Sequence, residues 1–123
     1  MLLALGYNPP YSREVEGQMR LLFTWLYSDP YETNPLMKAA QLHNRIIEIY
    51  PFEENSEEMA RFILYYFLLR QGFPPFSLGI SEQEYNEMMI NYLKNEDSRP
   101  FYQVVERAVF NKMEVLMQLT AME

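Results

Sequence analysis

The chain has 123 residues, which suits one domain and is long enough to bury a hydrophobic core. Its formal net charge is −7, and because so acidic a protein repels phosphate backbones, we expect no nucleic-acid partner. The absence of cysteine excludes disulfides and thiolate metal sites, and the single histidine excludes a multi-histidine metal site.

The apolar stretch at residues 1–5 (MLLAL) is too short for the core of a signal peptide and has no basic leader. We interpret it as a strand or helix stub packed on the body, or as the remnant of a longer chain. No segment of the sequence is apolar for long enough to cross a membrane. The expectation is a soluble protein of the cytoplasm with no membrane partner.

The first half of the chain predicts two amphipathic helices. Ser12 is the candidate N-cap of a helix over about residues 13–28, which follows an extended segment ending in two prolines. A second helix begins at Asn34-Pro35 and ends at Tyr50, because a proline follows that residue. His43 lies on the apolar face of this helix, where we interpret it as a structural residue and not as a catalytic one.

A third helix is predicted over residues 57–71. Asn55 is its candidate cap, and Glu58 follows three residues later in an arrangement like a capping box. Residues 62–69 read FILYYFLL, and a helix that is apolar nearly all round is usually the buried centre of a domain. A continuous strand is the alternative for this run, but the flanking residues favour a helix.

Two further helices complete the prediction. Ser81 and Glu84 form a capping box before a fourth helix, and Pro100 opens a fifth helix over about residues 100–121. One face of the fifth helix carries Phe101, Val104, Val105, Ala108, Val109, Met113 and Leu116. The expected fold is an all-α bundle of about five helices around the buried helix at 57–71, in one domain over residues 1–123. The long last helix makes pairing with a second copy of the chain, as a homo-oligomer, a further possibility.

The order of these elements resembles the Fic/Doc family, which has the Fido fold. The matching segments are Pro9-Pro10, Trp25-Leu26, Leu42-His43, Tyr50-Pro51-Phe52 and Gly72-Phe73-Pro74-Pro75, within residues 7–95. The resemblance implies a Fic-like helical domain. It also implies the family's activity, which is typically the transfer of AMP from ATP to a hydroxyl of a target protein; some relatives transfer other phosphate-containing groups.

The family signature is His-Pro-Phe-x-Asp/Glu-Gly-Asn-Gly-Arg-x-x-Arg, and this chain matches it in part. Laid on without gaps, the positions from the His to the last Arg fall on Tyr50, Pro51, Phe52, Glu54, Asn55, Ser56, Glu57, Glu58 and Arg61. The Pro, the Phe, the acidic residue and the last Arg match, whereas the His, the Gly-Asn-Gly loop and the first Arg do not. By this resemblance Glu54 is the candidate ligand for Mg²⁺, and Arg61 is the candidate contact for nucleotide phosphates.

The mismatches fall on the groups that carry the family's chemistry. Tyr50 has a reference pKa of about 10 and is a poor substitute for a histidine base. Glu57 and Glu58 place two carboxylates in the first helical turn, where the family binds phosphates through free backbone N–H groups. Arg61 is more simply explained as the ion-pair partner of Glu57 or Glu58 than as a phosphate ligand.

Three functions follow from these patterns, in order of preference. The first is a degenerate Fic-fold protein without AMP-transferase activity and without a cofactor, which acts through a protein partner. The second is a transferase with an altered active site, which uses ATP and Mg²⁺ with Glu54 and Arg61 to modify a protein hydroxyl. The third is a helical interaction module in which exposed Tyr and Met residues mark the surface for the partner.

Overall fold

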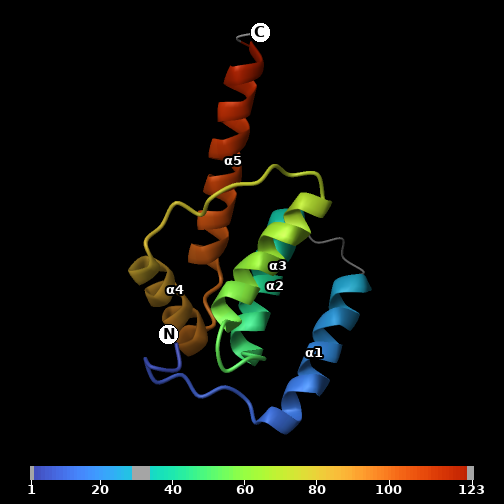
Figure 1. The fold of residues 1–123 in the computed structure, drawn as a ribbon, viewed down its shortest axis with the longest axis vertical. Helices are drawn as coiled ribbons and strands as arrows, with labels where there is room; N and C mark the ends of the chain where they lie inside the picture. Colours follow the sequence, from blue (N-terminus) through green and yellow to red (C-terminus); the bar gives the residue numbers. More distant parts are fainter. Residues whose placement is uncertain (1, 29–33, 122–123) are drawn as a thin grey trace.

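The computed structural model describes residues 2–28 and 34–121 and contains five helices (Figure 1). They are α1 (Ser12–Tyr27), α2 (Pro35–Ile49), α3 (Ser56–Arg70), α4 (Glu82–Asn95) and α5 (Arg99–Ala121). The described residues form no strand, so the predicted all-α bundle of five helices is confirmed. Within this part of the chain, no helix combines the length and apolar character needed to span a bilayer.

Helix α2 lies at the centre of the bundle and contacts α1, α3, α4 and α5. Its start is well defined, because the Asn34 side chain accepts a hydrogen bond from the Leu36 N–H at 2.9 Å and Pro35 occupies the first turn. Its buried residues are Leu36, Ala39, Ala40, Leu42, His43, Asn44, Ile46, Ile47 and Ile49. In Figure 1, α3 lies in front of α2, with α1 on one side and α4 on the other.

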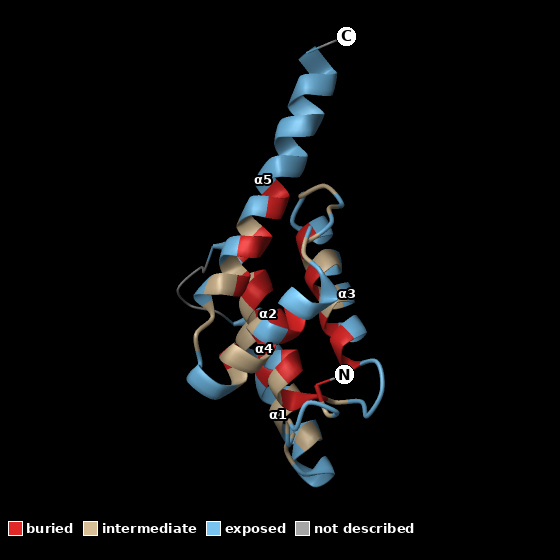
Figure 2. Ribbon diagram, turned by 90° about the vertical axis from the view of Figure 1, so that its left-hand side faces the viewer, coloured by how far each residue is buried: buried red, intermediate tan, exposed pale blue. Residues whose placement is uncertain are grey.

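Helix α3 is not the buried centre that the sequence predicts. It packs on α2 through a single face, which buries Ala60, Leu64 and Leu68. The opposite face exposes Phe62, Tyr66 and Leu69. The prediction failed because an apolar run indicates only that a helix has no polar face, whereas burial also requires neighbouring elements on every side. Figure 2 shows this division of α3 into a buried and an exposed side.

The helix starts confirm two predicted caps, Asn34 as described above and Ser81, and correct two others. At α4, Ser81 and Glu84 make both hydrogen bonds of the capping box. At α3, the Asn55 side chain makes no cap hydrogen bond, and the Ser56 hydroxyl instead accepts from the Phe52 N–H at 2.9 Å. At α1, Ser12 is the first helical residue, not the cap, so helix α1 begins one residue earlier than predicted.

Helix α5 packs on the bundle through its first half only. Phe101, Val105 and Val109 are buried, whereas every residue from 110 to 121 is exposed. Met113 and Leu116, the last two residues of the predicted apolar face, are therefore uncovered, because the helix extends past the elements that cover its first half. Figure 2 shows these last turns of α5 projecting beyond the rest of the molecule.

The N-terminal stretch packs on the body, as one interpretation of MLLAL expected. Leu2 is fully buried and belongs to the hydrophobic core. The backbone then turns, with the N–H groups of Leu5 and Tyr7 donating to the Leu2 carbonyl at 3.0 and 3.1 Å. This turn is neither a strand nor a helix, and it brings the backbone of Leu2 to the start of α3.

Candidate functional site

The candidate site is the connection between α2 and α3, where the partial Fic signature lies. Tyr50 ends α2 in the left-handed conformation, with φ 49° and ψ 61°, and its N–H donates to the Ile46 carbonyl at 2.8 Å. A non-glycine residue rarely adopts this conformation, which here reverses the chain sharply. The side chain of Tyr50 is buried, and its hydroxyl hydrogen-bonds to Glu57 in the first turn of α3.

The loop after Tyr50 places Glu54, the acidic residue of the signature, on the surface of the protein. Phe52, Glu54 and Asn55 are all exposed, and Asn55 is the second left-handed residue of the connection, with φ 70°. The buried Ser56 hydroxyl closes the loop by bonding both backbone groups of Phe52. Glu54 therefore sits on a closed exposed loop, and among the described residues no three His, Cys, Asp or Glu side chains gather to hold a metal ion.

Glu57 points into the protein and not towards solvent. Only 5% of its surface is exposed, and its Oε1 accepts a hydrogen bond from the Leu2 N–H at 2.8 Å. Burial opposes ionisation of this carboxyl, but the hydrogen bonds from Leu2 and Tyr50 outweigh burial and hold the pKa of Glu57 below its ordinary value of 4.5. A stably ionised carboxylate thus occupies the N-terminal turn of α3.

The same contact settles the protonation state of Tyr50. Burial raises the pKa of the Tyr50 hydroxyl above its ordinary value of 10.0, and the hydrogen bond to Glu57 raises the pKa further, as do the charges of Glu57 and Glu58. The hydroxyl is therefore protonated at neutral pH and acts as a hydrogen-bond donor to Glu57. At neutral pH it is even less available as a general base than an ordinary tyrosine, because less of it is deprotonated.

Arg61 turns towards α4. Its Nη2 lies 3.9 Å from Glu58 Oε1, and its guanidinium carbon lies 4.6 Å from the centre of the Tyr85 ring. Of the two ion pairs that the sequence suggested, the structure forms the one with Glu58. Arg61 also lines a cavity of about 320 Å³ between α3 and the segment at residues 77–82.

His43 is fully buried in the core, as its structural interpretation expects. Its Nδ1 lies 2.9 Å from Asn44 Oδ1, its Nε2 lies 2.7 Å from the Tyr85 hydroxyl, and its ring stacks on Phe101 at 4.2 Å. Burial lowers the pKa of His43 from 6.5 to about 3; the Asn44 hydrogen bond partly opposes this shift and the charge of Arg61 adds to it. The imidazole is neutral, and both of its nitrogens have partners.

The sequence analysis missed the inward position of Glu57. It placed this carboxylate at an open helix end, beside Arg61. The helical spacing could have predicted this position, because Glu57 lies on the same face as Ala60, Leu64 and Leu68, which α3 buries against α2. The hydrogen bond from Leu2 had no signal in the sequence, because it joins backbone and side chain across 55 positions.

Comparisons with known proteins cover the segment that holds the partial signature. A profile of the Fic/DOC family matches residues 3–68, which include α1, α2, the connection and most of α3. The chain is 29% identical over 113 residues to the protein adenylyltransferase Fic of Nematostella vectensis, covering 91% of this chain and 26% of that protein. It is 28% identical over 105 residues to the protein adenylyltransferase fic-1 of Caenorhabditis elegans, covering 84% and 21%.

A third relative extends the comparison to insects. The chain is 25% identical over 120 residues to the protein adenylyltransferase Fic of Aedes aegypti, covering 94% of this chain and 23% of that protein. The chain thus spans about a quarter of the length of the curated relatives that it matches. Because the family profile covers more than half of the chain, and its match includes the partial signature at Tyr50–Arg61, this protein belongs to the Fic/DOC family.

Proposed function

We propose that this chain is a degenerate Fic-fold protein that lacks AMP-transferase activity and acts through contacts with another protein. The observation that carries the proposal is the buried carboxylate of Glu57. It stands in the first turn of α3, at a position where the family signature has a glycine, and it is held there by the Leu2 N–H at 2.8 Å and by the Tyr50 hydroxyl.

The residues of this turn do not fit a triphosphate. A helix N-terminus attracts phosphate through the partial positive charge of its free N–H groups. Here the ionised Glu57 and the exposed Glu58 already supply two negative charges to that turn. A phosphate brought close to them in a partly dry site meets repulsion of several kcal/mol for each uncompensated like-charge pair, about 4 kcal/mol at 4 Å and intermediate dielectric.

The groups that would move a proton are also unsuited to the family's reaction. Tyr50 holds its proton more tightly than an ordinary tyrosine because of burial and Glu57. His43 is enclosed in the core with both ring nitrogens engaged, at 2.9 Å from Asn44 and 2.7 Å from Tyr85. A general base must reach the proton that it removes, and neither side chain meets that requirement.

Contact with a protein partner is supported by the apolar side chains that the bundle leaves uncovered. These are Phe62, Tyr66 and Leu69 on α3, and Phe110, Met113, Val115, Leu116, Met117 and Leu119 on α5. Aromatic residues and methionine are enriched at protein interfaces. For the end of α5, a second copy of the chain is one partner consistent with this proposal.

The test is calorimetric titration of the purified chain with ATP and Mg²⁺. We expect no heat of binding and no thermal shift. A ligand present at 100 times its dissociation constant stabilises its protein by about 2.7 kcal/mol, so binding of even modest affinity is detected. Micromolar binding that the Arg61→Ala substitution abolishes, and that Arg70→Ala leaves intact, would overturn the proposal.

One observation favours the altered transferase as a second candidate. Arg61, the matching arginine of the signature, lines the cavity of about 320 Å³ at residues 77–82, and the curated relatives are named protein adenylyltransferases. In this candidate Arg61 contacts the phosphates and Glu54 holds Mg²⁺. Transfer of labelled AMP to protein that is lost in both Glu54→Ala and Arg61→Ala would establish it.

A further inference from the structure

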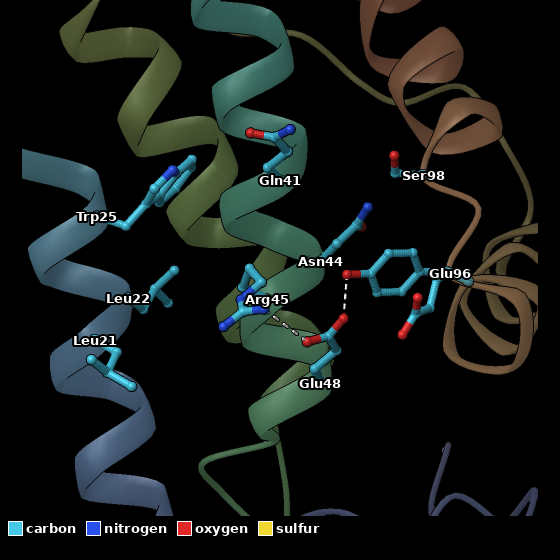
Figure 3. A pocket seen from close by; sticks show the side chains of 10 residues that line it. Leu21, Leu22, Trp25, Gln41, Asn44, Arg45, Glu48, Glu96 and Ser98 are labelled. Carbon is cyan, nitrogen blue, oxygen red and sulfur yellow. Dashed lines mark hydrogen bonds and ion pairs between the residues drawn. The ribbon is translucent and has the colours of Figure 1, made fainter. Parts of the chain in front are cut away.

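Two features of the surface lie outside the candidate site: a cavity beside α2 and the uncovered end of α5. The cavity, of about 580 Å³, lies between α1, α2 and the turn from α4 to α5, and its apolar wall on α1 includes Trp25 (Figure 3). Arg45 and Glu48 in its lining pair with each other at 3.5 Å, and Lys38 over the Trp25 ring offsets the charge of Glu96. The surroundings are thus close to neutral, and their charge selects no class of ligand.

The uncovered part of α5, residues 110–121, carries apolar side chains on most of its circumference. Six of them are 37–69% exposed: Phe110, Met113, Val115, Leu116, Met117 and Leu119. Phe110, Met113 and Met117 follow one another at spacings of three and four residues, which places them along one side of the helix. This spacing is the pattern through which two α-helices pack side by side. We call residues 110–121 the α5 tail.

The apolar surface of the α5 tail has the size that a weak pair of helices needs. A fully exposed side chain of these types has roughly 150 Å² of surface, so the six leave roughly 450 Å² uncovered on each copy of the chain. Patches of about 300–600 Å² are the largest on a typical monomer and are often functional. Two copies joined through this surface bury about 900 Å², close to the lower limit of about 1,000 Å² for a specific interface. The area therefore fits a reversible pair and not a permanent dimer.

The charges of the chain favour a second copy as the occupant of this surface. Lys112 and Glu114 are the only charged residues of the α5 tail, so the tail is neutral, whereas the whole chain carries −7. Two copies repel each other where their acidic surfaces meet, and contact through a neutral segment keeps this repulsion small. A partner selected by opposite charge would bind the acidic remainder of the chain instead. The tail therefore matches a neutral apolar surface, and every copy of the chain carries one.

The shape of the molecule lets two α5 tails meet without a collision of the bundles. Figure 2 shows α5 running beyond the rest of the molecule. A helix of 12 residues is about 18 Å long, and two such tails in antiparallel order can overlap over this length. The two acidic bundles then lie at opposite ends, and the helix dipoles oppose each other. A symmetric contact of this kind covers both tails at once and closes after two copies.

We propose that the α5 tail packs antiparallel on the α5 tail of a second copy, which forms a reversible homodimer with a micromolar dissociation constant. Phe110, Met113 and Met117 form the centre of the contact. Pairing supplies the cover that the end of α5 lacks in a single copy. This inference rests on the proposed function, because it names the protein partner for one of the uncovered surfaces.

The test is sedimentation equilibrium of the full chain at concentrations from about 5 to 500 µM, because a reversible pair responds to concentration by mass action. We expect the average mass to rise from 14.8 kDa towards twice that value. Met117→Glu should raise the dissociation constant at least about tenfold, because pairing would bury a carboxylate on each side. Met117 is 69% exposed, so this substitution leaves the core intact. A mass that stays at 14.8 kDa at every concentration would overturn the inference.

Phe62→Glu on α3 is the matched control. This side chain is 62% exposed and belongs to the other uncovered apolar surface of the described chain. The variant should pair with the affinity of the wild-type protein. Equal weakening in Met117→Glu and Phe62→Glu would show that association does not depend on α5 in particular, and would overturn the pairing of the tails.

The direction of the pair is tested with an introduced cysteine. The chain has no cysteine of its own, so Thr120→Cys carries a single thiol. A disulfide requires the two Cα atoms to lie within about 7 Å. The two copies of residue 120 meet in a parallel pair but lie at opposite ends of an antiparallel one, so we expect little disulfide-linked dimer on mild oxidation. Rapid and complete cross-linking would overturn the antiparallel pair.

Titration of the Met117→Glu variant with ATP and Mg²⁺ distinguishes failure of this inference from failure of the proposed function. Nucleotide binding by this variant, together with pairing of the wild-type protein, would refute the absence of nucleotide binding and leave the pair standing. A wild-type chain that neither pairs nor binds nucleotide would retain the proposed function and lose the pair. Each result therefore bears on one claim.

Discussion

Glu57 stands where the family signature has a glycine. Its side chain keeps a ligand away from the backbone at this position, and it also has a structural role. The carboxylate accepts hydrogen bonds from the Leu2 N–H and the Tyr50 hydroxyl, so it joins the N-terminal turn to the connection between α2 and α3. The residue that obstructs a phosphate thereby also contributes to the fold. A charged acceptor in a buried position strengthens each of these hydrogen bonds relative to a neutral one.

Replacing Glu57 with glutamine should therefore destabilise the protein. The glutamine amide keeps the shape of the side chain but loses the negative charge that accepts hydrogen bonds from the Leu2 N–H and the Tyr50 hydroxyl. Hydrogen bonds to charged groups contribute about 1.5–3 kcal/mol to stability. We expect the free energy of unfolding at pH 7, measured by urea denaturation, to fall by about that amount. Glu58→Gln is the neighbouring control: its side chain is 62% exposed, and its substitution should change stability by less than about 0.5 kcal/mol. Equal losses in the two variants would contradict this role.

The same variant should alter the pH dependence of stability. The folded-state pKa of Glu57 lies below its ordinary value of 4.5, so its stabilisation is present above that pH and is lost as the pH falls through the folded pKa. Wild-type protein should accordingly lose more stability than Glu57→Gln below pH 4.5, in the same urea measurement. Parallel curves for the two proteins in the acid range would show that Glu57 is not held ionised by its partners.

His43 supplies an independent prediction at the scale of one residue. Burial lowers its pKa to about 3, so the folded protein keeps it neutral while the unfolded chain binds a proton below its ordinary 6.5. Its contribution to stability is therefore complete above pH 6.5 and is lost progressively as the pH falls towards 3. The NMR signal of this single histidine should show no titration between pH 8 and pH 5. A midpoint near 6.5 would mean that the imidazole is open to water.

At the scale of helices, the sequence predicted where elements lie better than what covers them. Periodicity, proline positions and the capping box at Ser81 located all five helices, because these signals are local. The central position of α2 and the exposed face of α3 depend on which helices become neighbours. Two apolar helices that adjoin in the sequence give no local sign of which one lies inside.

The two faces of α3 should respond differently to truncation. Leu64 is fully buried against the bundle, so Leu64→Ala should lower the free energy of unfolding by about 2–5 kcal/mol. Phe62→Ala, on the exposed face of the same helix, should cost less than about 1 kcal/mol although it removes a larger side chain. Urea denaturation of both variants measures the difference. A loss in Phe62→Ala as large as that in Leu64→Ala would show that a second layer covers this face in solution.

At the scale of the whole molecule, the candidate site was predictable only in part. The signature alignment placed Tyr50 and Glu54 between two helices and Arg61 on the second helix, and the structure has Tyr50 at the end of α2, Glu54 in the loop and Arg61 in α3. The inward turn of Glu57 and the contact of Arg61 with Tyr85 were not predicted. Each of these joins residues far apart in the chain, and a single sequence carries no direct signal for such contacts.

The end of α5 offers the last prediction, because half of this helix lies outside the bundle. Residues 110–121 are all exposed, and an isolated helix of fewer than about 12–15 residues is marginal in water. At low protein concentration, backbone amides of residues 112–121 should therefore exchange with solvent at least about a hundredfold faster than those of residues 101–109. Hydrogen exchange read by NMR gives both rates in one experiment. At high protein concentration a second copy should protect the tail in the wild-type protein and in the equally exposed Leu21→Glu, but not in Met117→Glu. Strong protection of the tail at low concentration would contradict this prediction.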